Sequence, residues 1–139
     1  MIKTKMISLL CYNRFSFGDQ FVSQFVIFEC KWLFSIIVFY FHKSKGHQDR
    51  FHTHAFNAIS FKIFGTYDEH KLTNAETGDY TIKKRTEFFR YFPMDSFHRI
   101  ANSNGCCTVL MSGRWRKNWV EYVGGEIVKY ERGRILSNE

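Results

Sequence analysis

Three histidines are the side chains of this sequence best suited to chemistry. His52 and His54 close the segment 46–54 (GHQDRFHTH), and His98 closes the later segment 93–98 (PMDSFH). Side chains along a strand alternate with a period of two, so His52 and His54 point to the same face of one strand. A third imidazole, on a strand that follows a proline turn, would complete a three-nitrogen site. The spacing therefore predicts a pocket for one divalent transition metal ion.

Short strands are the elements that must position these histidines. Turn residues separate the apolar runs, as in the segment 73–79 (TNAETGD) and at Pro93. We expect strands at residues 21–28, 32–42, 51–64, 66–72, 80–84, 87–91, 97–101 and 106–112. No long stretch has an apolar repeat of 3.6 residues, which excludes α/β architectures. The pattern predicts an all-β fold, a sandwich or a small antiparallel barrel.

The length of 139 residues corresponds to one domain. We assign residues 21–123 to the β domain and residues 1–20 to an N-terminal arm or edge strand. The pattern of residues 124–139 does not separate strand from helix. Aromatic residues make up 19% of the chain, with 16 Phe against a single Pro, and this favours a β domain with an aromatic core.

Charge, hydropathy and cysteine content restrict the partners and the compartment. The net charge of +7 is compatible with an anionic partner, although a solvated basic surface is the simpler explanation. The most apolar segment, 21–41, is interrupted by Glu29 and Lys31, so we expect no transmembrane helix and no membrane partner. The four cysteines have no C-x-x-C spacing. Free thiols in a cytoplasmic protein are therefore expected.

The histidine segments resemble the two motifs of the cupin superfamily. In the first motif, Gly46 is followed by five residues, then by His52 and His54, and the closing glycine is Gly65. In the second motif, five residues separate Glu87 from Pro93, after which His98 and Asn102 follow at the family's spacing. The match covers residues 46–102. The resemblance implies a small antiparallel β-barrel of the double-stranded β-helix type, that is, a cupin-like jelly roll.

The sequence departs from these motifs in its carboxylate and its glycines. Ala58 occupies the position of the family's metal-binding glutamate, and Glu87 and Asp95 replace turn glycines. The resemblance then implies a metal site of three histidines, His52, His54 and His98, with open positions for water or substrate. Strand alternation places the Ala58 methyl group on the same face as His52 and His54.

The resemblance implies a metal-dependent enzyme that oxidises or isomerises a small anionic metabolite. One divalent ion (Fe, Zn, Ni or Mn) is the expected cofactor, and iron would suit dioxygenase-like chemistry. The Ser-x-His-x-Tyr element of the thiol dioxygenases is absent. Arg90 is the candidate that would bind the anion. The candidates for catalysis are Glu69, Tyr67 and His42, and Glu69 is also a candidate fourth metal ligand or a solvated carboxylate.

Three alternatives remain open on the sequence. A non-catalytic cupin module could bind or sequester a small anion or a nucleotide. The histidines could be the remnant of a site in a metal-free barrel. The segment 114–119 (RWRKNW) interleaves cations with aromatic residues, as nucleic-acid surfaces do, although nucleic acid is not the favoured partner. A homodimer is a further option, for which the sequence identifies no interface.

Overall fold

A computed structural model describes residues 7–17, 20–47, 50–54, 56–116, 118–123, 125–131 and 134–138. These residues form strands and no helix, so the described chain contains no helix that could cross a membrane. The strands are β1 (Ile7–Phe17), β2 (Gln20–Cys30), β3 (Ser35–Phe41), β4 (Phe51–His52), β5 (Ala58–Phe64), β6 (Tyr67–Asn74), β7 (Asp79–Arg85), β8 (Phe89–Phe92), β9 (His98–Ala101), β10 (Cys106–Ser112), β11 (Asn118–Val123), β12 (Glu126–Glu131) and β13 (Arg134–Asn138).

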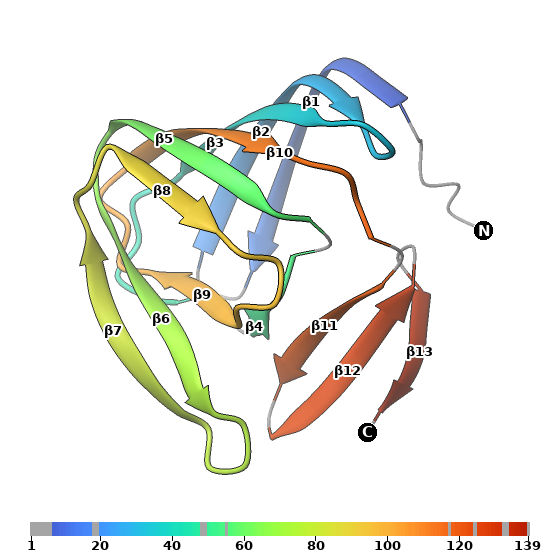
Figure 1. Ribbon diagram of the computed structural model, residues 1–139. Helices are drawn as coiled ribbons and strands as arrows, with labels where there is room; N and C mark the ends of the chain where they lie inside the picture. The colour runs from blue at the N-terminus through green and yellow to red at the C-terminus, as the bar shows by residue number, and fades with distance from the viewer. Residues whose placement is uncertain are drawn as a thin grey trace.

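The strands make two antiparallel sheets that face each other (Figure 1). The six-stranded sheet has the order β1-β2-β3-β10-β5-β8, and the seven-stranded sheet has the order β13-β12-β11-β4-β9-β6-β7. From β3 to β6 the chain alternates between the sheets, which is a jelly-roll arrangement. The predicted all-β jelly roll is confirmed. Among the described strands, no pairing joins the two sheets into a closed barrel.

The predicted single strand 51–64 is wrong. The chain forms β4 in the seven-stranded sheet, leaves it after His52, and enters the six-stranded sheet as β5 at Ala58. Phe56 lies in this crossing and is still buried, because the crossing passes through the core. Residues at even positions, such as His54, Phe56 and Ser60, line the cavity on both sides of the break as they would along one strand, so this spacing alone does not reveal the change of sheet.

Buried side chains between the sheets form two clusters. One contains Val22, Phe41, Tyr67, Ile100 and Cys106. The other contains Phe56, Ala58, Phe92 and Leu110. The turns after β5 and before β10 meet at this core: Gly65 has a φ of 83°, and a Cβ there would lie 2.6 Å from the Cα of Cys106. A glycine is therefore required where these two turns touch.

Candidate metal centre

The three histidines of the predicted site converge from two neighbouring strands. His52 on β4 lies directly opposite His98 on β9 in the antiparallel pair. Beyond the end of β4 the chain stays extended, because the Thr53 amide donates to the Val120 carbonyl of β11 at 2.9 Å. His54 therefore emerges on the same side as His52, as the two-residue period predicts.

The imidazole rings are close enough to share one ion. Their ring centroids lie 5.1 Å apart for His52 and His54, 4.7 Å for His52 and His98, and 4.9 Å for His54 and His98. One nitrogen from each ring lies within 4.8 Å of the other two. The Nε2 atoms of His54 and His98 are 2.7 Å apart. Two nitrogens bound at right angles to one ion, each at about 2.1 Å, lie about 3 Å apart, so the donor set fits a divalent transition metal.

Burial keeps two of these rings neutral. Desolvation, reinforced by His98, lowers the pKa of His52 to about 3. Desolvation also lowers the pKa of His54 well below its usual range, with smaller effects from His98 and His52. A neutral imidazole retains the lone pair that a metal ligand needs.

The histidines lie on the wall of a cavity of about 310 Å³ between the sheets. Apolar and aromatic side chains supply most of the surface of this wall, and polar groups lie among them. The apolar residues include Phe39, Phe41, Phe56, Phe92, Ile100, Leu110, Trp115 and Trp119. The hydroxyl groups are those of Thr53, Ser60, Tyr67 and Thr108. The charged pair on the wall is Arg50 and Glu121, whose Nη1 and Oε2 atoms are 2.8 Å apart.

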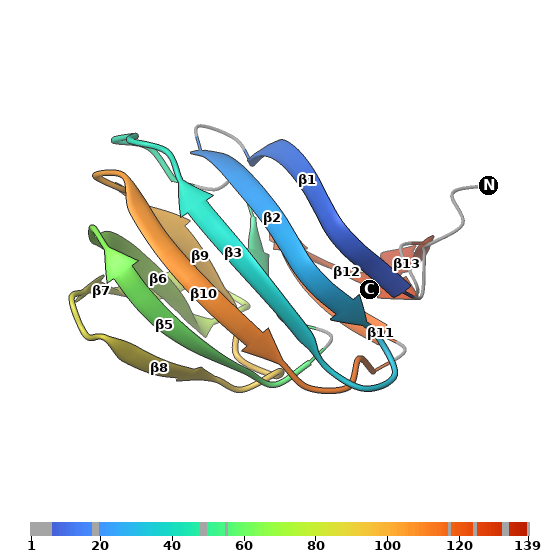
Figure 2. The same cartoon turned by 90° about the horizontal axis from the view of Figure 1, so that it is seen from above.

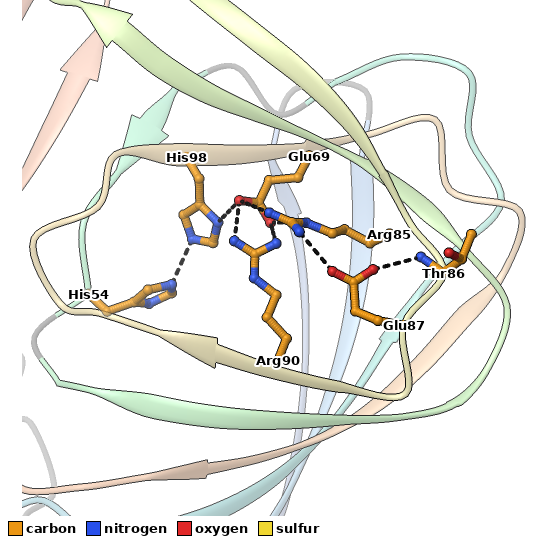
Figure 3. A network of polar contacts seen from close by, with 7 residues as sticks. All are labelled: His54, Glu69, Arg85, Thr86, Glu87, Arg90 and His98. Carbon is orange, nitrogen blue, oxygen red and sulfur yellow. Dashed lines mark hydrogen bonds and ion pairs between the residues drawn. The ribbon is translucent and has the colours of Figure 1, made fainter.

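A buried carboxylate lies behind His98 (Figure 3). The Glu69 side chain is 1% exposed, and its Oε1 atom is 3.8 Å from Nδ1 of His98. Arg85 donates to both Glu69 oxygens, at 3.1 and 3.2 Å, and Arg90 pairs with the same carboxylate. Arg85 also donates to Glu87 at 2.7 Å. The two carboxylates and two guanidinium groups of this network cancel in charge.

The structure thus places Glu69 neither among the clustered nitrogens nor in solvent. It lies on the far side of His98, in the position that orients a metal-binding imidazole in many proteins. Arg90 contacts Glu69 and covers the Phe92 ring, with its guanidinium carbon 4.4 Å from the ring centroid. It does not line the large cavity. It lines a smaller pocket that shares Tyr67 with that cavity, so an anion-binding role for Arg90 stays a prediction.

The other candidates are divided between the cavity and the outer surface. Tyr67 lines the cavity, and desolvation together with Glu69 raises its pKa far above its usual value. The phenol therefore stays protonated at neutral pH and has a proton to donate. His42 lies outside the cavity lining, and its Nε2 atom is 2.8 Å from the Ser23 hydroxyl oxygen. Ala58 is 2% exposed and packs in the cluster with Phe56, Phe92 and Leu110.

Sequence reasoning missed the roles of Arg85 and Arg116. Arg85 lies opposite Tyr67 in the β6–β7 pair, so its proximity to Glu69 follows only once that register is known. Arg116 donates to the His54 carbonyl at 3.3 Å, to the Met94 carbonyl at 3.1 Å and to Asp95 at 2.6 Å. It ties the two histidine-bearing segments together. The sequence feature that could have indicated this role is the position of Arg116 next to Trp115, which lines the cavity.

Comparison with solved structures identifies the fold. A structure of oxalate decarboxylase from Bacillus subtilis at pH 4.6 matches 81% of this chain at 16% identity and a TM-score of 0.52. A second, on its substrate binding mode and reaction specificity, matches at 15% identity and a TM-score of 0.53. The chain spans about 30% of the length of each. Oxalate decarboxylase is a cupin. This chain has the cupin fold.

No protein-family model and no curated protein matches the chain. The cupin assignment therefore depends on the structural match and on the three-histidine group, the cluster of possible metal ligands found among the described residues. Together they show a cupin fold with a three-histidine site suited to a single divalent metal.

Proposed function

We propose that this chain is a metal-dependent cupin enzyme that oxidises or isomerises a small anionic metabolite. His52, His54 and His98 would hold one divalent ion, with Fe, Zn, Ni and Mn as the candidates. The observation that carries the proposal is the convergence of three imidazoles on the wall of an aromatic cavity. Three nitrogen donors leave coordination positions that the cavity can supply with substrate.

The charges around the site favour an anionic substrate. The imidazoles of His52 and His54 are neutral, and the Glu69 network behind His98 has no net charge. The rim pair of Arg50 and Glu121 also cancels. The charge of a bound divalent ion would therefore meet no excess of protein carboxylate. When bound, such an ion supplies Lewis acidity toward a carboxylate or carbonyl oxygen.

The cavity wall favours a small substrate with an apolar body. Its volume of about 310 Å³ is at the low end of the range for ligand pockets. Phe41, Phe92 and Leu110 offer apolar surface, and Tyr67 offers a phenolic donor that burial keeps protonated. In this proposal Arg90 holds Glu69 behind His98.

The structural neighbours are consistent with this chemistry. Oxalate, a small dianion, is the substrate in the name of the Bacillus subtilis enzyme, and Mn(II) centres are described in that protein. These properties support a small anion and include Mn among the metals for this chain. At 16% identity they do not extend to the reaction itself.

A non-catalytic module that binds or sequesters a small anion is the second candidate. This candidate is favoured because the described cavity wall offers no unpaired carboxylate as a general base. The carboxylate on that wall, Glu121, is paired with Arg50. Tyr67 is too weak an acid to act as a base precursor at neutral pH. Such a protein would bind metal and ligand tightly and would return the ligand unchanged.

Metal analysis of purified variants tests the site first. The wild-type chain should contain about one transition metal ion per chain, and His52→Ala or His98→Ala should remove it while the circular dichroism of the folded protein persists. His42→Ala is the matched control, because His42 lies outside the cavity, and it should retain the metal. Full metal content in His98→Ala would contradict the proposed site.

Incubation with substrates then separates the enzyme from the module. The metal-loaded protein is mixed with small mono- and dicarboxylates, with and without dioxygen, and the mixture is followed by NMR. Conversion that His98→Ala abolishes supports the enzyme. Saturable binding of one equivalent with an unchanged ligand spectrum supports the module.

A further inference from the structure

Most of the outer face of the six-stranded sheet is apolar, although Arg14 on the edge strand β1 lies opposite Ser23 on this face. Figure 2 looks onto this sheet, in which β1, β2, β3, β10, β5 and β8 lie side by side. The strand registers define three transverse rows of outward-facing residues. The first row is Tyr12, Phe25, Val38, Val109, Phe61 and Phe89. The second is Ile36, Met111, Ile59 and Tyr91, and the third is Ser23, Tyr40, Cys107 and Phe64.

These three rows, which we call the apolar face, are accessible in the single chain. Phe25 is 43% exposed, Met111 44%, Phe89 51% and Tyr91 54%. Their sequence neighbours point the other way and form the core: Ile37 and Leu110 are both buried. The alternation is therefore regular, and apolar residues are found on both faces of these strands.

The other sheet shows what a solvated face looks like in the same molecule. The strand β7 is exposed along nearly its whole length and carries Asp79, Lys83 and Lys84. By contrast, none of the outward positions of β3, β10, β5 and β8 in the three rows carries a charge. Lys62 lies on β5, but its ammonium group donates to the Thr86 carbonyl at the sheet edge. Antiparallel sheets usually alternate apolar and polar residues, so an uncharged outer face indicates that a partner covers it.

We propose that a second copy of this chain packs on the apolar face, sheet against sheet, to form a twofold dimer. Six strands about 4.8 Å apart and seven residues of about 3.3 Å rise give a face of roughly 24 by 23 Å. The flat area of this face is on the order of 550 Å², and the side chains that project from it add to the accessible surface. A stable interface buries about 800 Å² of accessible surface per partner. The apolar face is thus close to the size that a dimer needs.

A twofold arrangement also satisfies the chemistry of the face. In a twofold interface the same surface contacts itself, so a charge close to the twofold axis would face its own copy. Val38 and Val109 are the middle pair of the first row. A twofold axis parallel to the sheets that passes over them places the uncharged positions of β3, β10 and β5 at the centre of the contact and Arg14 at its edge. Two sheets pack face to face at about 10 Å through interdigitating apolar side chains. The dimer would bury the aromatic residues of β8 at its rim.

The proposal does not depend on the metal, because the histidines lie between the sheets and the apolar face lies outside them. Sedimentation equilibrium of the wild-type chain should give twice the 16.6 kDa of one chain. Val109→Lys should raise the dimer dissociation constant by about 100-fold or more, because each copy would bury an uncompensated charge. Phe89→Lys, on the edge strand β8, should also raise the dimer dissociation constant, and it should disturb the fold less than Val109→Lys.

Ile82→Lys is the matched control. Ile82 is 61% exposed on β7 of the other sheet, so the same new charge should leave the dimer intact. A monomeric wild type at high protein concentration would overturn the proposal, and so would dimers that survive both Val109→Lys and Phe89→Lys. A monomer that sediments with phosphatidylcholine vesicles, and loses this in Phe89→Lys, would overturn it in favour of a lipid surface. Metal content measured on the same samples reports the fate of the histidine site separately.

Discussion

Replacement of Glu69 by Gln tests the buried network behind the metal site. The variant keeps the shape of the side chain and removes the charge that Arg85 and Arg90 share. Removing one partner of a buried ion pair costs about 3–5 kcal/mol. Arg85 keeps Glu87 as a second partner, so the loss falls mainly on Arg90, whose side chain is 15% exposed. We therefore expect the free energy of unfolding to fall by about 3 kcal/mol, at the lower end of the range.

The same change should weaken metal binding. The Glu69 carboxylate is 3.8 Å from Nδ1 of His98 and favours the tautomer with its proton on that nitrogen. Nε2, which faces His54, is then left free to bind a metal. Loss of such a carboxylate partner typically costs 10- to 100-fold in metal affinity. A residue with only a structural role would lower stability without this loss.

Two measurements on one set of variants separate these effects. Urea unfolding in the presence of a chelator gives the stability of the metal-free chain, and competition with a chromophoric chelator gives the Zn(II) affinity. Glu87→Gln is the control, because this carboxylate is 35% exposed, forms its ion pair with Arg85 and otherwise accepts from the Thr86 amide, so the change should cost less than about 1 kcal/mol. In Glu69→Gln with Arg90→Met the stability should partly return. Wild-type values for both measurements in Glu69→Gln would refute this reasoning.

Three further changes test the frame of the site. Ala58→Glu should lower the free energy of unfolding by about 3 kcal/mol or more, because it buries a carboxylate in an apolar cluster. Chemical unfolding measures this loss, and a stably folded variant with tighter metal binding would contradict it. Gly65→Ala should cost about 2 kcal/mol more than Gly125→Ala in thermal unfolding, since both glycines have positive φ but only Gly65 meets backbone atoms. Arg116→Ala should cost about 1–2 kcal/mol and reduce the Zn(II) affinity, because the guanidinium group holds the His54 carbonyl and a neighbouring turn.

The sequence was sufficient for the features that depend on local spacing. The two-residue alternation brought His52 and His54 to one side, and the proline turn placed His98 on the strand that pairs with β4. The strand 106–112 was predicted with the bounds observed for β10. These predictions succeeded because strand geometry fixes side-chain direction within a few residues.

Features that depend on strand register could not be read from the sequence. Glu69 was left as either a ligand or a solvated carboxylate, because its burial follows from Arg85 and Arg90 on two other strands. The segment 51–64 was predicted as one strand, because Phe56 lines the cavity two residues after His54, as it would if the strand continued. Long-range pairing decides both cases, and a single sequence does not contain it.

The position of the buried carboxylate links the unusual motif to the proposed chemistry. Ala58 stands where a cupin motif places a metal-binding glutamate, and it packs in the core. Glu69 supplies a carboxylate on the other side of His98, where two arginines neutralise it. A metal held by three neutral imidazoles would then keep its full charge toward the cavity. Such a site attracts an anionic ligand more strongly than one with a glutamate ligand, so an added carboxylate at the metal should weaken anion binding.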